Sequence, residues 1–156
     1  MKTAFLQQYA KVFRVFIKLV EEFDGDSWLH TGRKGYTAVR LSLHELQSIK
    51  FYLQDKTDDK LASGVAFDDN CWEMAEKDLP SQEEMVKWIH EYAARVEKWL
   101  QQMDFDHANS SFPWAGDTDG AIALFMFQHY LFHLGELSSL LNESKNGEVE
   151  DIFVKA

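Results

Sequence analysis

The positions of glycine and proline constrain this chain most strongly, because these two residues interrupt helices and strands. The eight glycines fall at positions 25, 32, 35, 64, 116, 120, 135 and 147, and the two prolines fall at 80 and 113. They leave four long stretches, 1–24, 36–63, 81–112 and 121–134, and we expect the last to continue through position 135 to about 142. The sequence therefore predicts four helices.

Apolar residues recur within each stretch at steps of three and four, the spacing of one face of an α-helix. In the first stretch this face consists of Phe5, Tyr9, Val12, Phe13, Phe16, Ile17, Val20 and Phe23. Ser81 and Glu84 have the spacing of a capping box at the start of the third stretch. A helix of about 20 residues is about 30 Å long and has to bury its apolar face. We therefore expect an all-α fold, a four-helix bundle, in a single domain spanning residues 1–156.

The balance of charges excludes several kinds of partner. Sixteen lysines and arginines stand against twenty-six aspartates and glutamates, so the net charge is −10 at pH 7. Such a chain repels the phosphates of nucleic acids and of anionic membrane surfaces, and we expect no partner of either kind. The sequence holds no run of about 18 to 20 uncharged apolar residues, and its single cysteine, Cys71, excludes an intrachain disulfide. We therefore expect a cytoplasmic protein.

Two histidines lie on an apolar helix face in the fourth stretch. His129 and His133 are four residues apart, so their side chains leave the same face one turn apart. Buried imidazoles need partners for their nitrogens, and one shared metal ion supplies a partner to both. The alternative is a pair of hydrogen-bonded histidines in the core. Gly135, inside an otherwise strong helix, indicates close approach or room beside His133.

A third metal ligand can come from another part of the chain. His44 lies beside the expected core positions Leu43 and Leu46, and it can reach the pair from a facing helix. His30 and His107, both in expected loops, are alternatives for this third position. Three imidazoles carry no negative charge, so a divalent ion keeps its full charge and has a fourth position open to water or substrate.

The residues around the histidine pair resemble those of a known family, the DinB/YfiT-like metalloenzymes. The family is marked by the pattern H-x3-H-x-G-[QE] near the end of the last helix of its bundle. Residues 129–136 read HYLFHLGE, and His44 matches the family's third metal histidine, which comes from the second helix. Leu134 stands where many members have arginine, Glu136 replaces the commoner glutamine, and Phe125 stands where many members have another histidine.

The resemblance implies a four-helix bundle with a long crossover connection, a divalent metal (zinc, nickel or similar) held by His44, His129 and His133, and frequently a homodimer. Characterised members include transferases and isomerases that use low-molecular-weight thiols such as bacillithiol or mycothiol. We therefore expect a metal-dependent enzyme for a small-molecule substrate, either a bacillithiol-type S-transferase or a metal-dependent hydrolase. The alternative is a non-catalytic ligand-binding or assembly bundle whose metal is structural or absent.

Charged residues lie beside the expected site. Glu136 follows the second histidine of the pair by three residues and can accept an imidazole N–H or act as an acid or base. Arg40 lies one turn before the third histidine and can bind an anionic group of a substrate, and Arg33 and Lys34 can extend such a site. The alternative is that Glu136 is a solvated or capping residue and Arg40 a surface charge.

Two further segments have simpler interpretations. An acidic run surrounds Cys71 and Trp72, and we expect it to form a solvated loop or a short helix. The tail after Gly147 contains a short apolar group at positions 152–154. We expect it to add a short strand or to pack against the helices.

Overall fold

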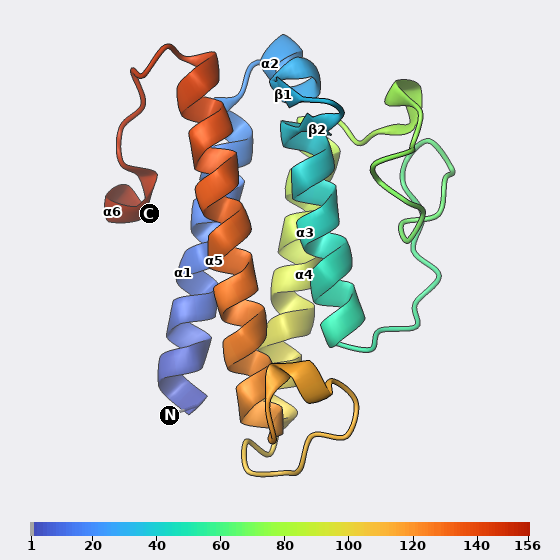
Figure 1. Ribbon diagram of the computed structural model, residues 1–156, viewed down its shortest axis with the longest axis vertical. Helices are drawn as coiled ribbons and strands as arrows, with labels where there is room; N and C mark the ends of the chain where they lie inside the picture. Colours follow the sequence, from blue (N-terminus) through green and yellow to red (C-terminus); the bar gives the residue numbers. More distant parts are fainter. Residues whose placement is uncertain (1) are drawn as a thin grey trace.

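The computed structural model describes residues 2–156 and is mostly α-helical, which confirms the expected predominance of helices (Figure 1). Within these residues the helices are α1 (Lys2–Glu22), α2 (Gly25–His30), α3 (Ala38–Tyr52), α4 (Gln82–Gln102), α5 (Asp119–Ser144) and α6 (Ile152–Lys155). Short 3-10 turns, η1 (Glu76–Asp78) and η2 (Pro113–Ala115), lie in the connections. The strands of the described part are β1 (Gly32–Arg33) and β2 (Tyr36–Thr37), which pair in antiparallel fashion.

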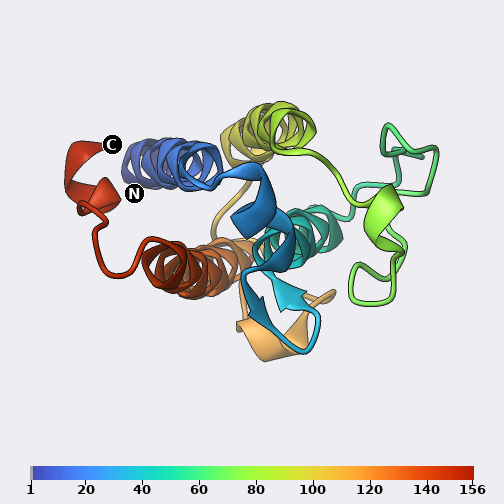
Figure 2. The ribbon, with the colours of Figure 1, turned by 90° about the horizontal axis from the view of Figure 1, so that it is seen from above.

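The four long helices of the described chain, α1, α3, α4 and α5, lie side by side, as Figures 1 and 2 show. α1 and α5 run in one direction, whereas α3 and α4 run in the other (Figure 1). The chain therefore has to travel back along the helices between α3 and α4. Residues 53–81, here called the crossover segment, make this return on the outer side of α3.

Apolar side chains of the long helices fill the space between them. Val15, Phe16, Leu19 and Val20 of α1 are fully buried, and burial of each such side chain contributes about 1.5–3 kcal/mol. The Tyr130 ring of α5 meets Phe16 edge-on, with the ring centres 5.7 Å apart. The helical spacing of apolar residues in the sequence thus corresponds to faces that are buried. None of the helices in residues 2–156 has the combination of length and apolarity that a membrane span requires.

Two helices end earlier than the uninterrupted stretches of sequence indicate. α3 stops at Tyr52 and α4 stops at Gln102, well before the next breakers in the sequence, Gly64 and Pro113. After α3, Gln54 adopts a left-handed conformation with φ of 52°. The Asp55 carboxylate then accepts hydrogen bonds from the backbone N–H and the hydroxyl of Thr57, at 2.9 and 2.5 Å. Such local hydrogen bonds compete with continuation of a helix.

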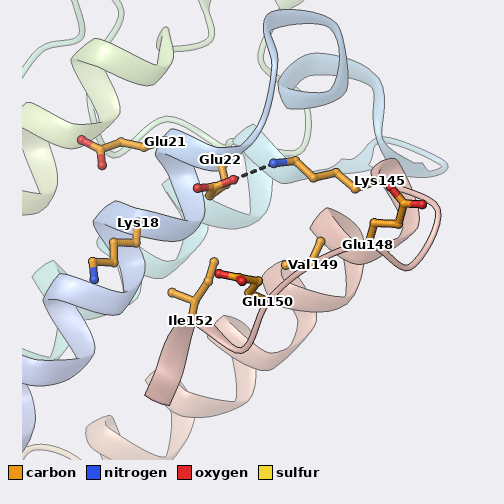
Figure 3. Close-up of a pocket in the computed structure, with 8 residues that line it drawn as sticks. All are labelled: Lys18, Glu21, Glu22, Lys145, Glu148, Val149, Glu150 and Ile152. Atoms are coloured by element: carbon orange, nitrogen blue, oxygen red, sulfur yellow. Dashed lines mark hydrogen bonds and ion pairs between the residues drawn. The ribbon is translucent and has the colours of Figure 1, made fainter. Parts of the chain in front are cut away.

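The tail turns back towards α1 and forms α6 instead of a strand. Lys145, at the end of α5, places its Nζ atom 2.6 Å from Oε2 of Glu22 at the end of α1 (Figure 3). The space between the tail and α1 is a hollow of about 550 Å³ that is lined by Lys18, Glu21, Glu22, Lys145, Glu148, Val149, Glu150 and Ile152. Of the two expected outcomes for the tail, the strand is therefore wrong, and the structure shows the tail beside the helices.

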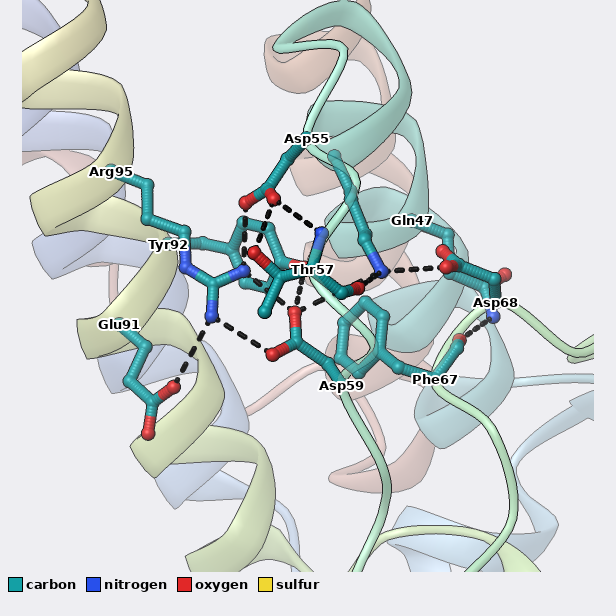
Figure 4. Close-up of polar contacts among 10 residues, drawn as sticks. Gln47, Asp55, Thr57, Asp59, Phe67, Asp68, Glu91, Tyr92 and Arg95 are labelled. Carbon is teal, nitrogen blue, oxygen red and sulfur yellow. Dashed lines mark hydrogen bonds and ion pairs between the residues drawn. The ribbon is translucent and has the colours of Figure 1, made fainter.

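Charged side chains fasten the crossover segment to α3 and α4 (Figure 4). Arg95 of α4 donates hydrogen bonds to both carboxyl oxygens of Asp59, at 2.6 and 3.1 Å. Lys50 of α3 donates to the backbone oxygen of Thr57 at 2.7 Å and to Asp68 at 2.5 Å. The side chains of Lys50 and Asp59 are only 3% and 8% exposed. Because these charges are shielded from water, their burial is tolerated only with the oppositely charged partners that the protein supplies.

Candidate metal centre

Three imidazoles meet between α3 and α5. His44 comes from the middle of α3, and His129 and His133 lie one turn apart on α5. One nitrogen of each ring lies within 4.8 Å of a nitrogen of the other two. The ring centre of His133 is 5.0 Å from that of His44 and 4.5 Å from that of His129. Within residues 2–156, no other group of three histidine, cysteine or acidic side chains has its ligand atoms this close together.

This donor set fits a divalent metal ion. The Nε2 atom of His129 is buried without a hydrogen-bond partner among the described residues, and a metal ion would supply one. Burial, and then the charge of neighbouring imidazoles, lower the pKa of His129 to about 4 and also lower the pKa of His44. Both rings are therefore neutral at pH 7 and offer lone pairs. Nitrogens on one tetrahedral zinc ion would lie about 3.3 Å apart, so the three imidazoles, whose nitrogens lie within 4.8 Å of one another, would have to move closer together to hold one.

Glu136 holds the ring of His133 in position. Its Oε2 atom lies 2.7 Å from Nδ1 of His133 and accepts a hydrogen bond from the Tyr36 hydroxyl at 2.5 Å. A proton on Nδ1 leaves the lone pair of His133 on Nε2, as in other sites where a carboxylate orients a metal-binding histidine. Burial, and then the hydrogen bond to Glu136, raise the pKa of Tyr36, which therefore remains a donor at neutral pH. The geometry thus favours an orienting role for Glu136.

Arg40 contacts the crossover segment. Its guanidinium donates hydrogen bonds to the backbone oxygens of Cys71 and Met74, the latter at 2.8 Å. These two carbonyls lie on either side of Trp72, whose ring centre is 5.2 Å from that of His44. Arg40 therefore positions the crossover segment next to the imidazoles. The contact with a substrate anion that the sequence suggests for Arg40 remains a prediction.

The two alternative third ligands have acidic partners elsewhere. His30 lies 3.8 Å from a carboxylate oxygen of Asp26 and 3.8 Å from one of Glu76. Nδ1 of His107 lies 3.1 Å from Oδ2 of Asp119. Neither histidine belongs to the cluster of three imidazoles. The structure therefore favours His44 over both alternatives.

Four other residues noted in the sequence are not members of the imidazole cluster. A β-carbon placed at Gly135 would meet no atom within 4 Å, so the expected close approach is wrong. Gly135 lies two positions after His133, and a step of two on a helix leads to the opposite side. Arg33 and Lys34 are exposed in the β1–β2 hairpin. Cys71 is buried, and burial raises the pKa of its thiol to about 11, which leaves it unreactive.

Sequence reasoning missed a buried acid beside the cluster. Glu45 is 1% exposed, and both of its carboxyl oxygens lack a hydrogen-bond partner among residues 2–156. Burial, and then the negative charge of Glu136, raise the pKa of Glu45. A signal was present, because Glu45 lies four residues from both Leu41 and Ile49 on the apolar stripe of α3. An acid at a core position is unfavourable for folding and therefore informative.

Replacing Glu45 with leucine is expected to raise the free energy of unfolding at pH 7 by about 1–3 kcal/mol, the usual cost of a buried polar group without a partner. Urea titration of Glu45→Leu and of the unaltered chain measures this difference. Glu97→Leu, at an exposed position of α4, is the matched control and should change stability by less than about 0.5 kcal/mol. A less stable Glu45→Leu protein would show that the buried carboxyl has a favourable partner.

No protein-family model, curated protein or solved structure matches this chain. The resemblance to the DinB/YfiT-like metalloenzymes therefore rests on residues 129–136 and on His44 alone.

Proposed function

We propose that this chain is a metal-dependent enzyme that acts on small molecules. The observation that carries the proposal is the cluster of His44, His129 and His133, in which a buried nitrogen lacks a partner among the described residues. The proposed metal is a divalent ion, zinc, nickel or similar, and the proposed fold is the DinB/YfiT-like four-helix bundle with a long crossover. The homodimer and the cytoplasmic location expected from the sequence remain predictions.

Access to the cluster supports an enzyme rather than a purely structural metal site. His44 and His129 are half-buried rather than fully buried, so part of each residue reaches solvent, while the Nε2 atom of His129 lies inside. Three protein ligands leave one position free, which is the pattern of catalytic zinc sites, whereas structural sites use four protein ligands. A divalent ion on three neutral imidazoles supplies a Lewis acid that makes a thiol or a water molecule nucleophilic at neutral pH.

The surrounding residues supply orientation and shielding. Glu136 fixes the ring of His133, and the Tyr36 hydroxyl in turn fixes the carboxylate of Glu136. Trp72 lies against His44 and keeps water from part of that ring. Glu136 is also the nearest acid to the cluster that is partly exposed, so it can accept the proton that a thiol or water loses.

The reaction that we propose first is transfer of a low-molecular-weight thiol, of the bacillithiol type, to an electrophilic small molecule. A carbon–sulfur bond forms, the leaving group departs with its electron pair, and the thiol proton passes to a base. Metal-dependent hydrolysis is the second candidate, because Glu136 is equally placed to take a proton from water.

Metal stoichiometry and chelation test the proposal. Purified protein is stripped with a chelator and dialysed against zinc or nickel, and elemental analysis is expected to find one ion per chain. Conjugation of bacillithiol to chlorodinitrobenzene and hydrolysis of nitrophenyl acetate are then measured before and after chelation. We expect chelation to remove one of these activities and the metal to restore it. Absence of a bound ion contradicts the proposal, and a bound ion without either activity supports the non-catalytic alternative.

A further inference from the structure

Each of the three imidazoles has an aromatic ring as a neighbour. These rings come from three different parts of the chain: the crossover segment, the first half of α5 and the turn of α5 that also carries the last histidine. The pairs are Trp72 with His44 at 5.2 Å, Phe125 with His129 at 6.4 Å, and Phe132 with His133 at 5.3 Å between ring centres. The surroundings of the polar cluster are therefore aromatic on several sides.

Two of these rings are exposed to solvent. Trp72 is 37% exposed and Phe132 is 63% exposed, whereas most large apolar side chains of the described chain are buried or half-buried. Trp72 lies against the histidine of α3, and Phe132 lies against a histidine of α5. One exposed ring from the crossover segment and one from α5 therefore adjoin the cluster. Such a pairing of apolar rings with a few convergent polar groups is typical of small-molecule sites.

The ring of Trp72 is fixed in place before any ligand arrives. It stacks on Tyr36, with the ring centres 5.2 Å apart and the planes within 6° of each other. The hydroxyl of Tyr36 is bound to Glu136, and the guanidinium of Arg40 holds the backbone on either side of Trp72. A ring that is already ordered loses little entropy when a ligand packs against it, which favours binding.

We infer that Trp72 and Phe132 form the walls of a substrate subsite, and that the substrate carries a flat aromatic group beside the group that faces the imidazoles. This inference rests on the proposed function, because it places the subsite next to the metal centre. Aromatic rings prefer offset-stacked or edge-to-face contact with other rings, and the exposed parts of Trp72 and Phe132 are available for such contact. Two rings are also far smaller than the roughly 800 Å² that a protein partner covers on each side of a stable interface.

A pair of probes isolates the contribution of the ring. Acetohydroxamate and benzohydroxamate share a metal-binding head, and only the second carries an aromatic ring. Their dissociation constants for the zinc-loaded protein are measured by calorimetry. We expect benzohydroxamate to bind about tenfold more tightly, a modest value for a flat ring stacked on an aromatic side chain. In Trp72→Ala the two constants should differ by less than about twofold, while acetohydroxamate and zinc bind as before.

Three further variants make the result decisive. Trp72→Phe should keep most of the preference, and Trp114→Ala, which removes an exposed tryptophan from η2, should keep all of it. Phe132→Ala should also lower the preference for benzohydroxamate over acetohydroxamate. Because Phe132 is exposed, this variant can be used for the test if Trp72→Ala does not fold. Equal affinity of the two probes for the unaltered protein, or an unchanged preference in both Trp72→Ala and Phe132→Ala, overturns the inference. Failure to bind zinc overturns the proposed function as well, so the two failures are distinguishable.

Discussion

Replacing His129 with alanine is expected to lower the affinity for zinc or nickel at least a hundredfold while the helices remain folded. His129 supplies the ring whose buried Nε2 has no other partner among the described residues, and its centre lies 4.5 Å from that of His133. Without this ring, only the imidazoles of His44 and His133 remain to bind the metal ion. Removal of a residue that merely orients a ligand costs about 10- to 100-fold in metal affinity, so loss of a ligand should cost more. Competition with a chromophoric chelator measures the affinity.

Two matched variants test whether the effect is specific to the centre. Glu136→Gln removes the charge that faces Nδ1 of His133 and should lower the affinity about 10- to 100-fold, less than the loss of His129. His90→Ala removes an exposed histidine of α4 and should leave the affinity unchanged. The metal centre is refuted if His129→Ala binds zinc as tightly as His90→Ala does.

Replacing Asp59 with alanine is expected to destabilise the protein by about 3–5 kcal/mol, the usual cost of removing one partner of a buried ion pair. The Asp59 side chain is 8% exposed, and its carboxylate takes two hydrogen bonds from Arg95 and one from the Tyr92 hydroxyl at 3.1 Å. Lys50 lies 3.8 Å from the same carboxylate and is itself buried. The variant therefore leaves two cations without their shared partner.

Urea denaturation of Asp59→Ala should be compared with that of Asp58→Ala. Asp58 is the neighbouring residue, its side chain is 84% exposed, and its loss should change stability by less than about 0.5 kcal/mol. The difference between Asp59→Ala and the unaltered chain should also depend on pH. The pKa of Asp59 is lowered in the folded protein, and the hydrogen bonds from Arg95 make the largest contribution to this shift. The stabilisation is therefore fully present above the ordinary carboxyl pKa of about 3.9 and is lost as the pH falls through the lower folded value. Equal stability of the two variants at pH 7 would contradict this account.

The long helices were predictable because the spacing of apolar residues survives in the packed protein. Their ends were less predictable, because a helix end depends on contacts that are distant in sequence. Ser81 accepts a hydrogen bond from the backbone N–H of Glu84, as its position in the sequence indicates. The carboxylate of Glu84, however, accepts from the backbone of Ala62 at 2.6 Å instead of completing the capping box. The position of the crossover segment decides that contact, and no local pattern in the sequence encodes it.

The candidate centre was predictable to a similar extent. The neighbouring positions of His129 and His133 follow from a spacing of four on one helix. His44 could be assigned to a facing helix because it lies beside the core positions Leu43 and Leu46, and the resemblance pointed to the same residue. Trp72 was not predictable as a neighbour of His44, because the acidic run around it resembles a solvated loop. Its position depends on hydrogen bonds from α3 to backbone atoms, which leave no mark on the side chains of the loop.

That kind of attachment has a consequence for evolution and engineering. Arg40 binds the backbone oxygens of Cys71 and Met74, and Gln47 binds those of Phe67 and Asp69 at 2.6 and 2.8 Å. Every amino acid has a backbone carbonyl. Mutations in this part of the crossover segment can therefore accumulate without breaking the hydrogen bonds that hold it to α3. New ligand preferences can thus arise by exchange of exposed residues of the crossover segment. Arg40 and Gln47 of α3, in contrast, have to be conserved.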